Sequence, residues 1–227
     1  MDVYLVPLGS DRYELYCEVP DEAHDEGAPP PHGFVRRMRH RFRELLAEAE
    51  RERRQGRAVH AEVGWAGRIK AKTMRWIAES IAEQRLLWHL RRQTSACLFY
   101  PDDLGESTAV ELMRKQLGRD YDKHRFWLMI DSIGFALSGL LMLVPGPNIL
   151  AYYFAFRLVG HYLSLQGARQ GLKMVVWRVE KSSPLAELRR AINLDPELRA
   201  RRVTDVALKL HLERLVSFFE RTAIRTS

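Results

Sequence analysis

The longest apolar stretch of the chain runs from Phe126 to Gln166 and consists of two segments joined at an uncharged Pro-Gly-Pro-Asn sequence. As a helix with a rise of about 1.5 Å per residue, each arm would reach ~28 Å. That length is close to the ~30 Å hydrocarbon core of a bilayer. The pattern predicts a central helical hairpin over residues 126–168, with its apex at Pro145, Gly146, Pro147 and Asn148. Such a hairpin is suited to a membrane, and also to the core of a soluble helical domain.

Alternating apolar and polar positions predict a β-hairpin over residues 1–19, with Gly9-Ser10-Asp11 as its turn. Two further strands are expected. One lies near residues 96–100, which are apolar and are followed by a proline, and one near 173–179, which are rich in β-branched and aromatic residues. We expect the strands to form a small antiparallel sheet. The predicted fold class is therefore α+β and predominantly helical, with the long apolar hairpin at its centre.

The rest of the chain divides by composition. Residues 20–33 form a Pro-rich acidic loop, residues 34–125 a charged helical region, and residues 173–227 a strand followed by C-terminal helices. One domain overall is expected. Ser183-Pro184 and Asp195-Pro196 are each typical of a helix start. One face of a single long final helix would carry Val203, Val206, Ala207, Leu210, Leu215, Phe218 and Phe219.

The formal net charge of +7 fits a partner with acidic lipid headgroups or, less specifically, a nucleic acid. A basic amphipathic helix is predicted from Phe34 onward, and such a helix could face lipid or a protein partner. The alternative is an ordinary solvated surface. The basic patch consists of Arg36, Arg37, Arg39, Arg41 and Arg43.

Several classes of protein lack support in the sequence. It has no P-loop, no GxGxxG or GxSxG motif, no HExxH, no CxxC and no nucleic-acid-binding signature. We therefore expect no enzyme activity, no metal, no cofactor and no nucleic acid partner. The two cysteines, Cys17 and Cys97, are expected to be reduced thiols. The N-terminus resembles neither a signal peptide nor a transit peptide.

The candidate chemistry lies inside the apolar hairpin. Asp131 is on the first arm, and Arg157 and His161 lie one helical turn apart on the second. Antiparallel arms folded about Gly146 would place Asp131 level with His161, because both are fifteen residues from that glycine. A carboxylate, a guanidinium and an imidazole in a low dielectric should face one another. They form either a proton or ion relay, since intramembrane ionisable groups often serve transport, or a buried ion pair that fixes the helix register.

Four features favour a membrane location for the hairpin: the arm lengths, the uncharged apex, the basic flanks and the small residues at every fourth position. With Lys123 and Arg125 before it and Arg169 and Lys173 after it, both termini would be cytoplasmic. Against a membrane, a charged residue at a helix centre costs roughly 2.5–3.5 kcal/mol on insertion scales.

Two stretches, AESIAEQRLLWHLR (Ala78–Arg91) and LVPGPNILAYYFAFRLVGHYLSLQGA (Leu143–Ala168), carry a family resemblance. The sequence resembles the mitochondrial potassium–proton exchange-related family, in a bacterial form. The matching features are the turn at Pro145–Asn148, the aromatic run Tyr152–Phe156, Arg157, and His161-Tyr162. The resemblance implies a link to potassium–proton exchange but assigns no catalytic residues. Without a transit-type N-terminus, a bacterial cytoplasmic membrane is expected instead of a mitochondrial one.

Two hypotheses follow. In the first, the protein is membrane-associated, contacts lipid, and participates in or regulates cation (potassium)–proton exchange, as a homo-oligomer or as a subunit of an exchanger. In the second, it is a soluble, cytoplasmic helical interaction or scaffold module with a buried hairpin and no transport role.

Overall fold

The computed structural model describes residues 1–9, 11–18, 86–140 and 149–223 of the 227-residue chain. The chain divides into two units. The first contains residues 1–20, 86–130 and 161–227, and the second contains residues 21–85 and 131–160. The predicted basic patch Arg36–Arg43 and the predicted apex Pro145–Asn148 lie outside the described residues.

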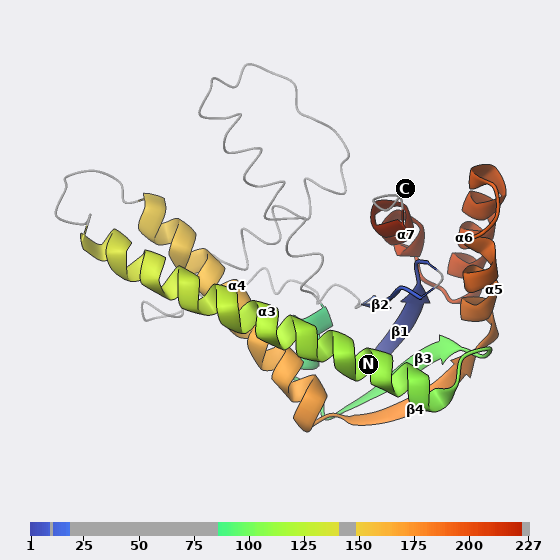
Figure 1. Ribbon diagram of the computed structural model, residues 1–227, viewed down its shortest axis with the longest axis horizontal. Helices are drawn as coiled ribbons and strands as arrows, with labels where there is room; N and C mark the ends of the chain where they lie inside the picture. Colours follow the sequence, from blue (N-terminus) through green and yellow to red (C-terminus); the bar gives the residue numbers. More distant parts are fainter. Residues whose placement is uncertain (10, 19–85, 141–148, 224–227) are drawn as a thin grey trace, which may run out of the picture. The chain divides into compact units, whose positions relative to one another are not determined.

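The first unit is built on a four-stranded sheet with the order β2-β1-β3-β4 (Figure 1). β1 and β2 form the antiparallel hairpin that the sequence predicts, with Leu5 opposite Leu15. However, β1 pairs with β3, and β3 with β4, in parallel. The strands are β1 (Asp2–Pro7), β2 (Tyr13–Tyr16), β3 (Ser95–Pro101) and β4 (Val176–Ser182).

The prediction of a wholly antiparallel sheet was therefore wrong. Parallel neighbours require a long crossover connection. Here the segment between β3 and β4 contains two helices, α3 (Glu106–Leu140) and α4 (Ile149–Lys173). β4 also begins later than expected, at Val176, because α4 continues to Lys173. The mixed topology could not be read from strand composition, which is the same for both directions of pairing.

The strand β1 is buried on both faces of the sheet. Val3, Leu5 and Leu98 pack with Met113 and Leu117 of α3 on one face. The other face packs against the C-terminal helices through Val6 and Tyr16, with the partly buried Tyr4 and Phe99 beside them. Successive residues of a strand point to opposite faces, so β1 supplies both cores. These two cores stabilise the first unit.

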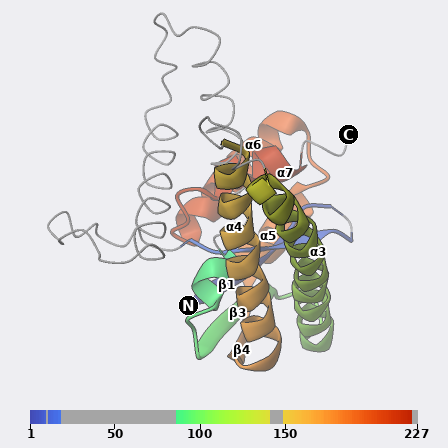
Figure 2. The same ribbon diagram turned by 90° about the vertical axis from the view of Figure 1, so that its left-hand side faces the viewer.

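The helix α3 is longer than expected, at 35 residues. The sequence pattern predicts a boundary between a charged helix that ends at Arg125 and an apolar arm that begins at Phe126. No boundary exists there, because neither a proline nor a capping residue separates the two. α3 and α4 lie side by side (Figure 2). No helix in the described part of the chain combines the length and the apolarity needed to cross a membrane.

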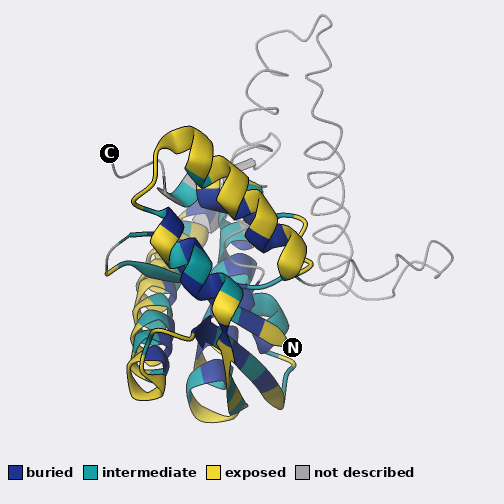
Figure 3. Ribbon diagram, turned by 90° about the vertical axis from the view of Figure 1, so that its right-hand side faces the viewer, coloured by how far each residue is buried: buried dark blue, intermediate teal, exposed yellow. Residues whose placement is uncertain are grey.

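The C-terminal region forms three helices, α5 (Ser183–Ala191), α6 (Pro196–Lys209) and α7 (Leu215–Ala223). The predicted single long helix is broken between α6 and α7, where His211 has a left-handed backbone with φ of 54°. The N-cap of α5 is Ser182, one residue before the predicted Ser183, and Asp195 is the N-cap of α6. Buried and exposed positions alternate around these helices (Figure 3).

The N-terminal strands and the last helix are joined by Glu18. Its carboxylate accepts hydrogen bonds from the backbone N–H groups of Glu213 and Arg214, at 2.9 and 2.7 Å. The hydroxyl of Tyr16 also donates to Glu18. A carboxylate at a helix N-terminus satisfies N–H groups that have no partner within the helix. Glu18 therefore fixes where α7 begins.

Candidate functional site

In the second unit, a buried ion pair joins the two long helices. Nε of Arg157 on α4 donates to both carboxylate oxygens of Asp131 on α3, at 2.9 and 3.1 Å. The side chain of Asp131 is 2% exposed and that of Arg157 is 17% exposed. Arg157 also donates to the hydroxyl of Tyr153 one turn earlier on α4, at 3.1 Å. These hydrogen bonds direct the guanidinium at the carboxylate.

Close packing around this pair keeps it from solvent. Gly134, one turn after Asp131, faces the ring of Phe154, and a methyl group at Gly134 would overlap that ring. Ala155 and Ser138 are also buried. Small residues at such positions let helix backbones approach closely. The absence of a side chain at Gly134 is therefore part of what allows α3 and α4 to enclose the ion pair.

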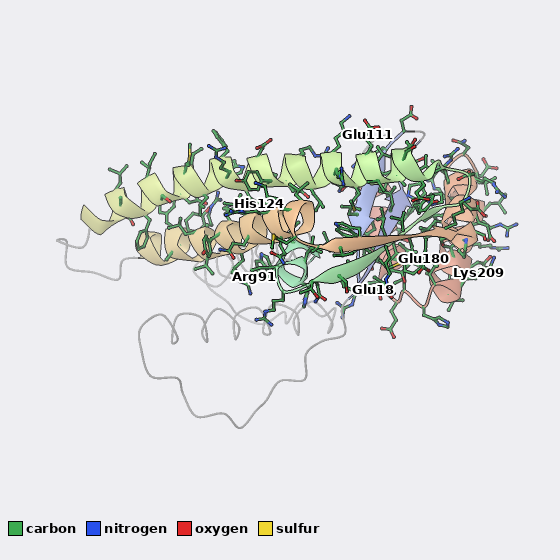
Figure 4. All side chains as sticks on the ribbon, turned by 90° about the horizontal axis from the view of Figure 1, so that it is seen from below. Glu18, Arg91, Glu111, His124, Glu180 and Lys209 are labelled. Carbon is green, nitrogen blue, oxygen red and sulfur yellow. The ribbon has the colours of Figure 1, made fainter. Side chains whose placement is uncertain are left out.

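In the first unit, a second polar pair joins the same two helices. Nδ1 of His124 on α3 lies 2.9 Å from Nδ1 of His161 on α4, and the ring of Trp127 stacks on His161 with centroids 6.4 Å apart. One imidazole must donate its Nδ1 proton and the other must accept it. Figure 4 shows His124 between the two helices.

His124 is buried, with 4% of its surface exposed. Burial, reinforced by the neighbouring His161 and Lys123, lowers the pKa of His124 to about 4. The imidazole of His124 is therefore neutral at neutral pH. One Nδ1 proton then lies between the two rings.

In the first unit, the C-terminal half of α4 packs closely against residues 86–90, which are helical. Nε1 of Trp88 donates to Oγ of Ser164 at 2.9 Å. Gly167 faces the carbonyl oxygen of Leu87 so closely that any side chain there would overlap it. These contacts hold α4 in place within the first unit, where Ala168 and Leu172 join the core.

The predicted trio is therefore divided between two pairs. Asp131 binds Arg157, one of its two predicted partners, and the other predicted partner, His161, binds His124. His124 and Tyr153 were missed as candidates. Their signal was present, because His124 lies two turns before Asp131 on α3 and Tyr153 lies one turn before Arg157 on α4.

The side chains that α3 and α4 bury against each other include polar ones, whereas many of their exposed side chains are apolar. In the first unit, exposed positions of α3 include Phe126, Met129 and Ile130. In the second unit they include Ile133, Phe135 and Leu137, with exposures of 62, 43 and 59%. Soluble helices show the opposite arrangement. This part of α3 is therefore suited to contact with an apolar environment.

Metal chemistry has no support in the described part of the chain, where no three side chains of His, Cys, Asp or Glu form a cluster. Cys17 and Cys97 are both partly buried and are not joined by a disulfide. What the two pairs can do is hold charge and protons inside a helix pair: a carboxylate with a guanidinium, and two imidazoles that share a hydrogen bond.

A comparison with family models finds one match, to the mitochondrial K+-H+ exchange-related family, over residues 3–175. That range covers β1 to α4, including both polar pairs. Neither a curated protein nor a solved structure matches the chain. Because the matched range is most of the sequence, the chain belongs to the mitochondrial K+-H+ exchange-related family.

Proposed function

We propose that this protein associates with a membrane through α3 and α4 and takes part in, or regulates, potassium–proton exchange there. The observation that carries the proposal is the buried Asp131–Arg157 pair, in a helix whose exposed residues around Asp131 are largely apolar. Ionisable groups inside membrane helices are typically paired and functional. The family to which the chain belongs agrees with this role.

The proposed orientation follows from charge. Lys123 and Arg125 precede the apolar part of α3, and Arg169 and Lys173 end α4, whereas residues 141–148 between the helices carry no charge. Basic residues remain on the cytoplasmic side. In the proposed topology, both termini are cytoplasmic and the segment between α3 and α4 enters the lipid.

The proposed role is ion handling without covalent catalysis. One ion pair in one helix pair does not make an alternating-access transporter, which is usually built from repeats around a central site. The protein would therefore act as a homo-oligomer or together with an exchanger. In either case Asp131 and Arg157 are the buried charges that an ion would meet between α3 and α4, and His124 and His161 supply a second hydrogen-bonded polar pair between the same helices.

Membrane fractionation tests the location. Cells expressing the full chain are lysed, and their membranes are washed at high salt and then at alkaline pH. The proposal predicts that the chain stays with the membranes through both washes. A matched variant, Ile133→Lys with Leu137→Lys, places charges on the exposed apolar positions and should shift the chain to the soluble fraction.

Release of the unmodified chain by the salt wash would contradict the proposed insertion. The protein would then be better described as an interaction module that binds other proteins. That reading predicts no difference between the double lysine variant and the unmodified chain in the fractionation.

A further inference from the structure

The strand β4 (Val176–Ser182) is at the edge of the sheet in the described part of the chain. Val176 is 68% exposed, and Arg178, Glu180 and Lys181 are exposed as well. The hydrogen-bonding groups on the outer side of an edge strand are available to a strand of another chain. Figure 4 labels Glu180 of this strand.

The outward-facing backbone groups can be identified from one hydrogen bond. The N–H of Val176 donates to the carbonyl of Thr94, at 3.0 Å, and so points toward β3. Backbone groups alternate in direction along a strand in a ladder. The groups of Arg178 and Glu180 therefore also point toward β3, and those of Trp177, Val179 and Lys181 point toward the open edge.

A second copy of β4 can pair with this edge in several antiparallel registers, but outward-facing residues must lie opposite outward-facing residues. A register centred on Arg178 would place arginine opposite arginine, and one centred on Glu180 would place glutamate opposite glutamate. The register centred on Val179 places Arg178 opposite Glu180 twice. It also aligns all seven residues of the strand with their counterparts.

Charge makes this register self-complementary. Arg178 and Glu180 would form non-hydrogen-bonded pairs, in which side chains across an antiparallel ladder are closest. Charged residues on an edge strand usually prevent pairing with other strands. Here their spacing of two residues excludes the neighbouring registers and favours the central one. Val179 would lie opposite its own copy, as a two-fold axis requires.

We propose that two copies of this chain dimerise by antiparallel pairing of β4 with β4, centred on Val179, which joins their two sheets into one continuous sheet. The proposal is independent of the exchange role, because β4 lies outside both polar pairs. It identifies a second copy of the chain as the partner of this edge.

Charge reversal and mixing test the proposal. Arg178→Glu places two glutamates opposite Glu180 residues, and Glu180→Arg places two arginines opposite Arg178 residues. Each variant alone should dimerise at least about tenfold more weakly than the unmodified chain, because two attractive cross-strand pairs become repulsive. An equimolar mixture of the two variants should recover the dimer, since each mixed pair again joins opposite charges. The mass of the purified full chain is measured by analytical ultracentrifugation.

Recovery on mixing cannot arise from a folding defect of either variant. A monomeric unmodified chain, a dimer that both reversals leave intact, or a mixture that stays monomeric would each overturn the proposal.

A cysteine variant gives an independent test that needs no charge change. In a Cys17→Ser, Cys97→Ser background, Val179→Cys should form a disulfide-linked dimer when diamide is added, because paired Cα atoms lie about 5.5 Å apart. The control Val176→Cys is at an exposed position but would lie roughly 20 Å from its copy, and it should not cross-link. Equal cross-linking of both variants would overturn the register.

Discussion

One guanidinium nitrogen, Nε of Arg157, lies 2.9 Å from Oδ1 and 3.1 Å from Oδ2 of Asp131, so both carboxylate oxygens share a single N–H group. A second nitrogen of the guanidinium, Nη1, donates to the hydroxyl of Tyr153. A buried carboxylate depends strongly on the charged group that it pairs with. The consequences for stability and for ion handling can be separated by substitution.

Breaking the ion pair on one side should destabilise the protein more than removing it. Asp131→Asn leaves Arg157 without its carboxylate and should cost roughly 3–5 kcal/mol, whereas Asp131→Leu with Arg157→Leu should recover most of that loss. Tyr153→Phe, which keeps the pair, should cost about 1 kcal/mol. Chemical denaturation measures all three. Equal losses in the single and the double variant would contradict the importance of the pairing.

Acid should weaken the protein through His124. The pKa of His124 in the folded protein is about 4, below the ordinary 6.5, because the residue is buried beside His161 and Lys123. The unfolded chain therefore takes up a proton that the folded protein resists. The stability of the folded protein is therefore unaffected by His124 above about pH 6.5. As the pH falls toward 4, the free energy of unfolding decreases by on the order of 2–3 kcal/mol.

The control for this pH dependence is His124→Gln, which cannot titrate. Its free energy of unfolding should fall less between pH 7 and pH 4.5 than that of the unmodified chain. Identical pH profiles would show that His124 is not the group responsible.

Two glycines on the long helices should respond in opposite directions to alanine. Gly167→Ala would place a methyl group against the carbonyl oxygen of Leu87 and should destabilise by at least about 2 kcal/mol. At Gly118 of α3 a methyl group would meet nothing within 4 Å, so alanine should stabilise by roughly 0.5–1 kcal/mol through helix propensity. Thermal unfolding of the two variants gives the comparison, and a loss of stability at Gly118 would be inconsistent with it.

Removal of the Glu18 carboxylate should release α7. Glu18→Ala deprives the N–H groups of Glu213 and Arg214 of their acceptor and should cost roughly 1–3 kcal/mol. Amide exchange should accelerate in α7 (Leu215–Ala223) and much less in α3. The matched control Glu111→Ala, at an exposed position of α3, should change stability by less than about 0.5 kcal/mol. Unchanged exchange in α7 would exclude the capping role.

Much of the fold could be predicted from local pattern. The alternation around Leu5 and Leu15 indicated the N-terminal hairpin, and Pro196 marked the start of α6. The parallel direction of β3 and β4 could not be predicted, because it depends on how the intervening helices return the chain. The break at His211 was also missed, since the apolar spacing continues through it.

The candidate site was predicted only in part, because local pattern identifies the charged residues but does not fix how the two helices are aligned. Composition identified Asp131 and Arg157 as charges that needed a partner within an apolar stretch. Their register was set by close packing, such as that of Gly134 against Phe154, and this placed Asp131 one turn away from the expected His161. His124 was missed because it lies beside Lys123 and Arg125, where a basic triplet is typical of a surface.

Potassium-driven proton movement in membrane vesicles tests the proposed function most directly. Everted vesicles are prepared from host cells with and without the chain and are loaded with acid, and proton efflux on addition of potassium is followed with a pH-sensitive dye. We expect the chain to change the rate of potassium-dependent efflux. The folded Asp131→Leu, Arg157→Leu variant should restore the rate seen without the chain. Equal rates with and without the unmodified chain would contradict a role in potassium–proton exchange.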